Sequence, residues 1–135
     1  MERKRVLVVD DSLTMRQLQC LILRDAELIV SEAADGLAAL TMIESERPDI
    51  VLLDVNMPVI DGRETFARLR RMTGCAELPV IFVTAEDEAD LPRDAHTMSL
   101  QKPLNAEDLR RTVRTLVGLS PESQRLIKAA PPREG

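Results

Sequence analysis

The segment 50–62, with the sequence IVLLDVNMPVIDG, constrains the fold more strongly than any other part of the chain. Its four consecutive apolar residues lack the alternation of a half-exposed strand, and such a run is typical of a strand buried on both faces of a parallel sheet. The run ends at Asp54, and open parallel sheets bind ligands at the carboxyl ends of their strands. Alternatively, Asp54 only begins a turn, which is a frequent role of aspartate. Other polar groups at the same edge would favour a functional site.

Strand and helix patterns alternate along the whole chain. Buried apolar runs predict strands over residues 6–9, 28–31, 50–54, 80–84 and 98–101. Helical spacing predicts inward faces at Met15, Leu18, Leu21 and Ile22, at Leu37, Leu40 and Ile43, and at Phe66 and Leu69. Ser12 and Asn105 are good N-caps for the first helix and for a last helix that ends near Val117. The alternation predicts an α/β fold, a single-domain doubly wound five-stranded parallel sheet with right-handed crossovers.

Composition and charge limit the class of protein. A chain of 135 residues suffices for one domain, and its net charge of −5 argues against a nucleic-acid backbone as the main partner, so no DNA binding is expected. The apolar run after the basic segment 3–5 stops at Asp10 after four residues, so neither a signal peptide nor a membrane span is predicted and the cytoplasm is the expected location.

The composition changes after Gly118. A helix-start pattern follows at residues 120–122, and the last residues read AAPPREG. We therefore expect residues 1–118 to form the domain, and residues 119–135 to add a short helix and a flexible tail without a second domain.

Polar side chains follow four of the predicted strands, at one edge of the predicted sheet. They are Asp10 and Asp11, Asp54, Thr84, and Lys102. Three crowded carboxylates repel one another, and a hard divalent cation such as Mg²⁺ relieves that repulsion. A lysine and a hydroxyl beside them suit phosphate oxygens, which is the environment that phosphoryl transfer to an aspartate requires. Singly, each residue has an ordinary explanation, such as a helix cap for Asp10 or a solvated surface position for Lys102.

Four motifs carry a resemblance to a known family. VVDDS at 8–12, LLDVNMPVIDG at 52–62, PVIFVTA at 79–85 and LQKPL at 100–104 occur in the order and spacing of the receiver domain of two-component response regulators, and together they span most of residues 4–117. The resemblance implies the flavodoxin-like strand order 2-1-3-4-5, which chemotaxis regulators also have.

The resemblance also implies an acceptor and a metal site. Asp54 would accept a phosphoryl group from a phosphohistidine of a sensor histidine kinase or a phosphotransfer protein. Asp11, Asp54 and the backbone carbonyl of Asn56 would bind Mg²⁺, with Mn²⁺ as a substitute, and Asp10 would hold the ion through water.

Further roles follow from the same resemblance. Lys102 would stabilise the phosphoryl group, and the Lys102-Pro103 bond would be cis. Thr84 would hydrogen-bond a phosphoryl oxygen, while the side chains of Asn56 and Glu86 would modulate the lifetime of the acyl phosphate.

Two features depart from the family pattern. Ser99 occupies the switch position, where typical members carry an aromatic side chain that changes rotamer when the threonine moves. The crossover at residues 85–98 is shorter than usual by about one helical turn and contains Pro92, so we expect a short or irregular fourth helix.

The leading functional interpretation is a stand-alone phosphorylatable receiver that an unknown downstream protein reads or that serves as a phosphate sink. Such a protein is not an enzyme beyond its own phosphoryl transfer and dephosphorylation. An alternative is a receiver that binds proteins or nucleotides independently of phosphorylation, as the two departures would allow. A third is a hydrolase with an aspartate nucleophile, although the adjacent pair Asp10-Asp11 differs from the haloacid-dehalogenase-like pattern, in which one residue separates the two aspartates.

Two predicted helices carry arginine-rich stretches, at residues 68–71 and 110–114. We interpret them as solvated faces with intrahelical ion pairs, Glu64 with Arg68 and Glu107 with Arg111. A less favoured interpretation is a surface for an acidic partner or a nucleotide messenger.

Overall fold

The computed structural model describes residues 3–85 and 90–120. The elements, in chain order, are β1 (Lys4–Val9), α1 (Leu13–Ile22), β2 (Leu28–Ala33), α2 (Gly36–Glu46), β3 (Ile50–Asp54), α3 (Gly62–Arg70), β4 (Val80–Thr84), β5 (Thr97–Gln101) and α4 (Ala106–Leu116). All strand pairs are parallel and the order is β2-β1-β3-β4-β5. The predicted fold class and strand order are confirmed.

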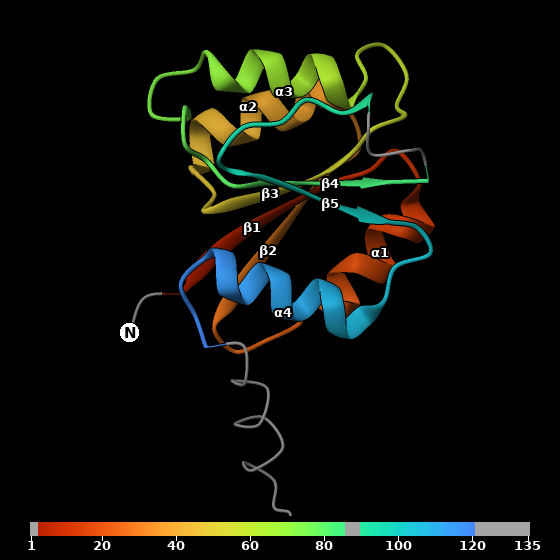
Figure 1. Ribbon diagram of the computed structural model, residues 1–135, viewed down its shortest axis with the longest axis vertical. Helices are drawn as coiled ribbons and strands as arrows, with labels where there is room; N and C mark the ends of the chain where they lie inside the picture. Colours follow the sequence, from red (N-terminus) through yellow and green to blue (C-terminus); the bar gives the residue numbers. More distant parts are fainter. Residues whose placement is uncertain (1–2, 86–89, 121–135) are drawn as a thin grey trace, which may run out of the picture.

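The helices form two layers around the sheet, with α2 and α3 on one face and α1 and α4 on the other (Figure 1). Alternate residues of β3 point to opposite faces. Leu53 lies in the core beneath α2 and α3, and Leu52 in the core beneath α1 and α4. All five residues of β3 are buried, as the unbroken apolar run predicted.

Every described α-helix begins at a side-chain cap. The four caps are Ser12, Asp35, Asp61 and Asn105, and each side-chain oxygen accepts a hydrogen bond from the backbone N–H three residues later. These bonds satisfy donors that would lack a partner in the first turn of a helix. The predicted caps at Ser12 and Asn105 are confirmed.

Three predicted strands are longer in the structure, and β5 begins one residue earlier than predicted, at Thr97. β1 begins at Lys4, and β2 continues to Ala33 because parallel pairing with β1 extends as far as Val9 opposite Ala33. Glu32 and Ala33 therefore also lie within the strand. The polarity of Glu32 suggested an earlier end, but β2 is an edge strand, and its side chains are partly exposed.

The predicted inward faces of the first two helices were partly wrong. Leu18 and Leu21 are 42% and 59% exposed, and Leu37 is 47% exposed. On α1 the buried position is Gln19. The sequence contains more leucines than one helical face can bury, and only the position of the sheet decides which stripe turns inward.

The crossover between β4 and β5 contains no α-helix among its described residues, 85 and 90–96. Leu91 is only 7% exposed and packs into the core beneath α2 and α3. Two arginines of α3 bind the crossover: Arg63 Nε donates to the carbonyl of Asp90 at 3.3 Å, and Arg70 Nε donates to the Asp94 carboxylate at 2.8 Å. That bond from Arg70 also holds the pKa of Asp94 below its usual range.

The arginine-rich stretches are only partly solvated. Glu64 pairs with Arg68 at 2.8 Å as predicted, but Arg111 pairs with Asp108 rather than with Glu107. Arg114 is fully buried, so its interpretation as a solvated residue was wrong.

Arg114 joins α4 to the loop before β2. Its Nη1 lies 2.6 Å from Asp25 Oδ2, its Nη2 pairs with Glu27, and its Nε donates to the carbonyl of Ser120 at 2.7 Å. Arg114 therefore connects the segment near residue 120 to the loop that carries Asp25 and Glu27.

Within the described ranges, no helix combines the length and the apolar character that crossing a bilayer requires. The short helix and tail expected at residues 119–135 lie, beyond Ser120, outside the described residues.

Candidate functional site

The carboxyl ends of β1, β3 and β5 bring three carboxylates and one ammonium group together. Lys102 Nζ lies 3.4 Å from Asp54 Oδ1 and 3.7 Å from Asp10 Oδ2. One oxygen each of Asp10, Asp11 and Asp54 lies within 4.8 Å of the others. Asp10 and Asp54 are buried, whereas Asp11 is exposed. These four predicted site residues therefore lie close together at one edge of the sheet.

The loop after Asp54 folds back against its own strand. Gly62 N–H donates to the carbonyl of Val55 at 2.8 Å, and this contact brings the start of α3 beside the end of β3. A Cβ atom on Gly62 would lie 2.4 Å from the backbone oxygen of Asp54. Only glycine permits this approach, which explains the Asp61-Gly62 pair of the sequence. Asn56 is exposed in the same loop.

Thr84 ends β4 next to the lysine. Its side chain is buried, and its carbonyl accepts a hydrogen bond from the backbone N–H of Lys102 at 2.8 Å. The Lys102-Pro103 peptide bond is cis, as predicted. Glu86, the other predicted modulating residue, lies outside the described residues.

Two residues of α1 contact Asp10 and were not singled out in the sequence. Gln19 Nε2 donates to Asp10 Oδ2 at 3.2 Å, and Arg16 Nη1 donates to the Asp10 carbonyl at 2.9 Å. The sequence did hold a clue to the role of Gln19, because this residue stands four positions after Met15 on a helical stripe that was expected to face the core. A polar residue there needs a buried partner.

Burial and charge repulsion act together on Asp54. Removal from water, followed by the negative charges of Asp10 and Asp11, raises the pKa of its carboxyl to about 6, and Lys102 opposes that rise. The carboxyl remains mostly ionised at neutral pH, but burial and the neighbouring negative charges destabilise its charged form.

Replacing Asp54 with asparagine is expected to stabilise the metal-free protein at pH 7 by about 2 kcal/mol. The pKa of Asp54 rises from 3.8 to about 6 on folding, so the folded chain keeps this proton over a pH range in which the unfolded chain loses it. Its contribution to stability is therefore present below pH 3.8 and declines as the pH rises through about 6. Urea unfolding of both chains at about pH 4 and pH 7 measures the difference. An equal gain at both pH values would contradict this cause.

The donor set fits a hard divalent cation. Three carboxylates supply the oxygen ligands that Mg²⁺ prefers, and the backbone carbonyl of Asn56 follows two residues after Asp54. A cation among these groups would offset the repulsion that raises the pKa of Asp54. Asp11, Asp54 and the Asn56 carbonyl would hold it directly, with Asp10 behind them.

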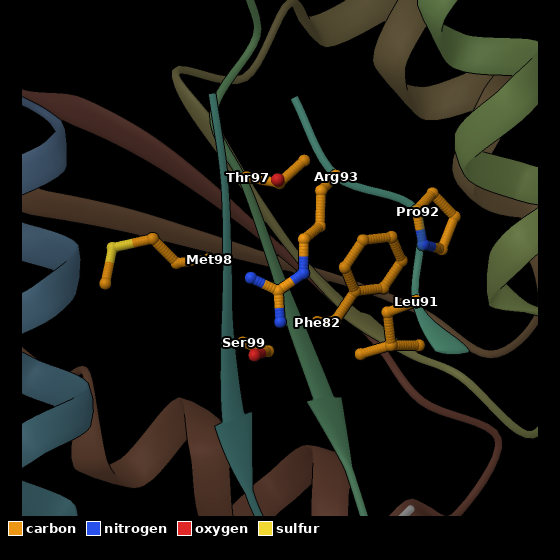
Figure 2. A pocket seen from close by; sticks show the side chains of 7 residues that line it. All are labelled: Phe82, Leu91, Pro92, Arg93, Thr97, Met98 and Ser99. Atoms are coloured by element: carbon orange, nitrogen blue, oxygen red, sulfur yellow. The ribbon is translucent and has the colours of Figure 1, made fainter. Parts of the chain in front are cut away.

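A small cavity lies beside Ser99. Ser99, Phe82, Leu91 and Arg93 help to line a space of about 50 Å³ between β4, β5 and the crossover. Figure 2 shows the Arg93 side chain extending beside the Phe82 ring toward Ser99. A short hydroxyl side chain and an arginine therefore border this space.

Comparison with known proteins agrees with this arrangement. Residues 6–114 match the response regulator receiver domain family. The response regulator MprA of Mycobacterium ulcerans is 40% identical over 118 residues, which are 84% of this chain and 50% of that protein. The sporulation initiation phosphotransferase F of Bacillus subtilis is 30% identical over 123 residues, which are 88% of this chain and 98% of that protein.

Solved structures also match. The chemotaxis response regulator CheY4 of Vibrio cholerae superposes with a TM-score of 0.76 at 34% identity, covering 84% of this chain and 98% of that one. The chain spans between 24% and 50% of the length of three of the curated relatives that it matches. The family match covers most of the chain, and we conclude that the chain belongs to the receiver domains of two-component response regulators.

Proposed function

We propose that Asp54 accepts a phosphoryl group in a Mg²⁺-dependent reaction from a phosphohistidine of a sensor histidine kinase or a phosphotransfer protein. A protein partner then reads the phosphorylated state, or the chain serves as a phosphate sink. The observation that carries this proposal is the convergence of Asp10, Asp11 and Lys102 on a buried Asp54.

The proposed reaction assigns one task to each group. An oxygen of Asp54 attacks phosphorus, the bond from phosphorus to the imidazole nitrogen breaks, and its electron pair stays on that nitrogen. Lys102 offsets the charge of the phosphoryl oxygens, and the Thr84 hydroxyl donates a hydrogen bond to one of them. A bound Mg²⁺ would supply further charge neutralisation. Asp11, Asp54 and the Asn56 carbonyl would hold it directly and Asp10 through water, while Asn56 and Glu86 would modulate the lifetime of the product.

The transfer is tested with Mg²⁺ and acetyl phosphate, followed by intact mass measurement. The wild-type chain is expected to gain one phosphoryl group, and Asp54→Asn is expected to gain none. Asp49→Asn is the matched control, because Asp49 stands just before the opposite end of the same strand and bonds to the backbone N–H of Arg5. It should be phosphorylated like wild type. A phosphorylated Asp54→Asn chain would contradict the proposal.

A second candidate is a receiver that binds a protein or a nucleotide without phosphorylation. Ser99 at the switch position and the described part of the crossover, which lacks an α-helix, favour it. Mg²⁺ binding without any adduct from acetyl phosphate would support this candidate over the first.

A further inference from the structure

Gln19 is a buried amide beside the acidic cluster. Its side chain is 1% exposed, and it is the buried residue of α1. Its Nε2 donates to Asp10 Oδ2 at 3.2 Å, in a contact shielded from water. A buried amide is unfavourable unless it is hydrogen-bonded, so this single contact compensates the burial of its donor group.

The Asp10 carboxylate is held from several sides. Its Oδ1 accepts a hydrogen bond from the backbone N–H of Ser12 at 2.9 Å, and its Oδ2 faces both Gln19 and Lys102. Arg16, one helical turn before Gln19, holds the Asp10 carbonyl at 2.9 Å. Helix α1 therefore contacts both the backbone and the side chain of Asp10.

Losing the amide would change only one of these contacts. The Ser12 and Arg16 bonds fix the backbone and one carboxylate oxygen, while Gln19 is the α1 side chain that holds the other oxygen. Without it, Oδ2 retains Lys102 at 3.7 Å, and that ammonium group also faces Asp54. The Asp10 carboxylate is then free to turn toward Lys102 and away from the oxygens of Asp11 and Asp54, which would bind the ion.

We propose that Gln19 is a positioning residue for the acidic cluster: its amide fixes the orientation of the Asp10 carboxylate and thereby sets the affinity of the cluster for Mg²⁺. This role rests on the proposed function, since it concerns the same metal-dependent site. Groups that hydrogen-bond the carboxylates around a metal fix the orientation of those carboxylates, and the loss of such a group typically weakens metal binding by about tenfold or more.

The test compares two glutamines of the same helix. Gln19→Met keeps the length of the side chain but removes the donor, and Gln17→Met makes the same change at an exposed position of α1. Mg²⁺ affinity is measured by following backbone amide resonances of the unphosphorylated chains during a titration with the metal. Gln19→Met is expected to bind Mg²⁺ about tenfold more weakly, while Gln17→Met binds as wild type does.

Folding is checked separately. Urea unfolding should show Gln19→Met to be folded and less stable than wild type, because methionine fills the same space but the buried Oδ2 of Asp10 loses one donor. If that variant fails to fold, Gln19→Leu gives the same comparison. Wild-type affinity in a folded position-19 variant would overturn the role of Gln19 alone. A wild-type chain that does not bind Mg²⁺ would overturn the proposed function and this role together.

Discussion

Gly62→Ala is expected to destabilise the protein by about 3 kcal/mol and to slow phosphorylation of Asp54. The new methyl group would lie 2.4 Å from the Asp54 backbone oxygen and 2.8 Å from the Val55 Cα atom. Both are backbone atoms at the end of β3, so the strand end itself must move. That movement shifts the Asp54 carboxylate relative to Lys102, and small displacements at a reacting centre reduce rate strongly.

Gly36→Ala is the comparison variant. Gly36 is also the first residue of a helix, but the three atoms nearest to its added methyl group would be side-chain atoms of Thr65 and Ile60, the closest being the buried Thr65 Oγ1 at 2.1 Å. Gly36→Ala should therefore also destabilise the protein, but the backbone of β3 is not among these nearest contacts, so the phosphorylation rate should stay near that of wild type. Urea unfolding and the rate of adduct formation with acetyl phosphate measure both effects. A Gly62→Ala chain that is phosphorylated at the wild-type rate would contradict the prediction.

Arg114→Met is expected to lower the free energy of unfolding by about 3 to 5 kcal/mol. Arg114 is fully buried, and its partner Asp25 has a side chain that is only 3% exposed. Without the guanidinium, the carboxylates of Asp25 and Glu27 lose their counter-charge while Asp25 stays out of water. An uncompensated buried charge costs more than the loss of an exposed ion pair.

Arg111→Met provides the control on the same helix. Arg111 and its partner Asp108 each have side chains that are 54% exposed, so this change should alter stability by less than about 0.5 kcal/mol. Adding Asp25→Asn and Glu27→Gln to Arg114→Met should recover part of the lost stability, because it removes the stranded charges. Similar losses for the two arginines, or no recovery in the triple variant, would show that the ion pairs are not the cause.

Most of the fold followed from local patterns. A parallel sheet was predicted from the apolar run at residues 50–53, which ends at Asp54, and from the repeated alternation of strands with helices. An unbroken apolar run indicates a strand that is buried on both faces, as strands of parallel sheets are. The edge strand β2 was predicted two residues too short, since a partly exposed strand tolerates a charged residue such as Glu32.

The candidate site was equally visible in its main residues. Side chains at the ends of parallel strands meet at one edge of the sheet, whatever the packing of the helices. The sequence alone therefore predicted that Asp10, Asp54 and Lys102 lie close together, as they do in the structure. The absence of an α-helix from residues 90–96 agrees with the expected irregular crossover.

Strand periodicity and strand ends are local properties, so the sequence alone identified the sheet and the polar residues along its carboxyl edge. Gln19, by contrast, became a partner of Asp10 only when α1 packed with one particular stripe against the sheet. Arg114 became the buried partner of Asp25, 89 positions away, only when α4 docked beside the loop that precedes β2. A helix with apolar or charged residues on several sides has more than one face that it can bury, and its environment in the folded chain selects among them.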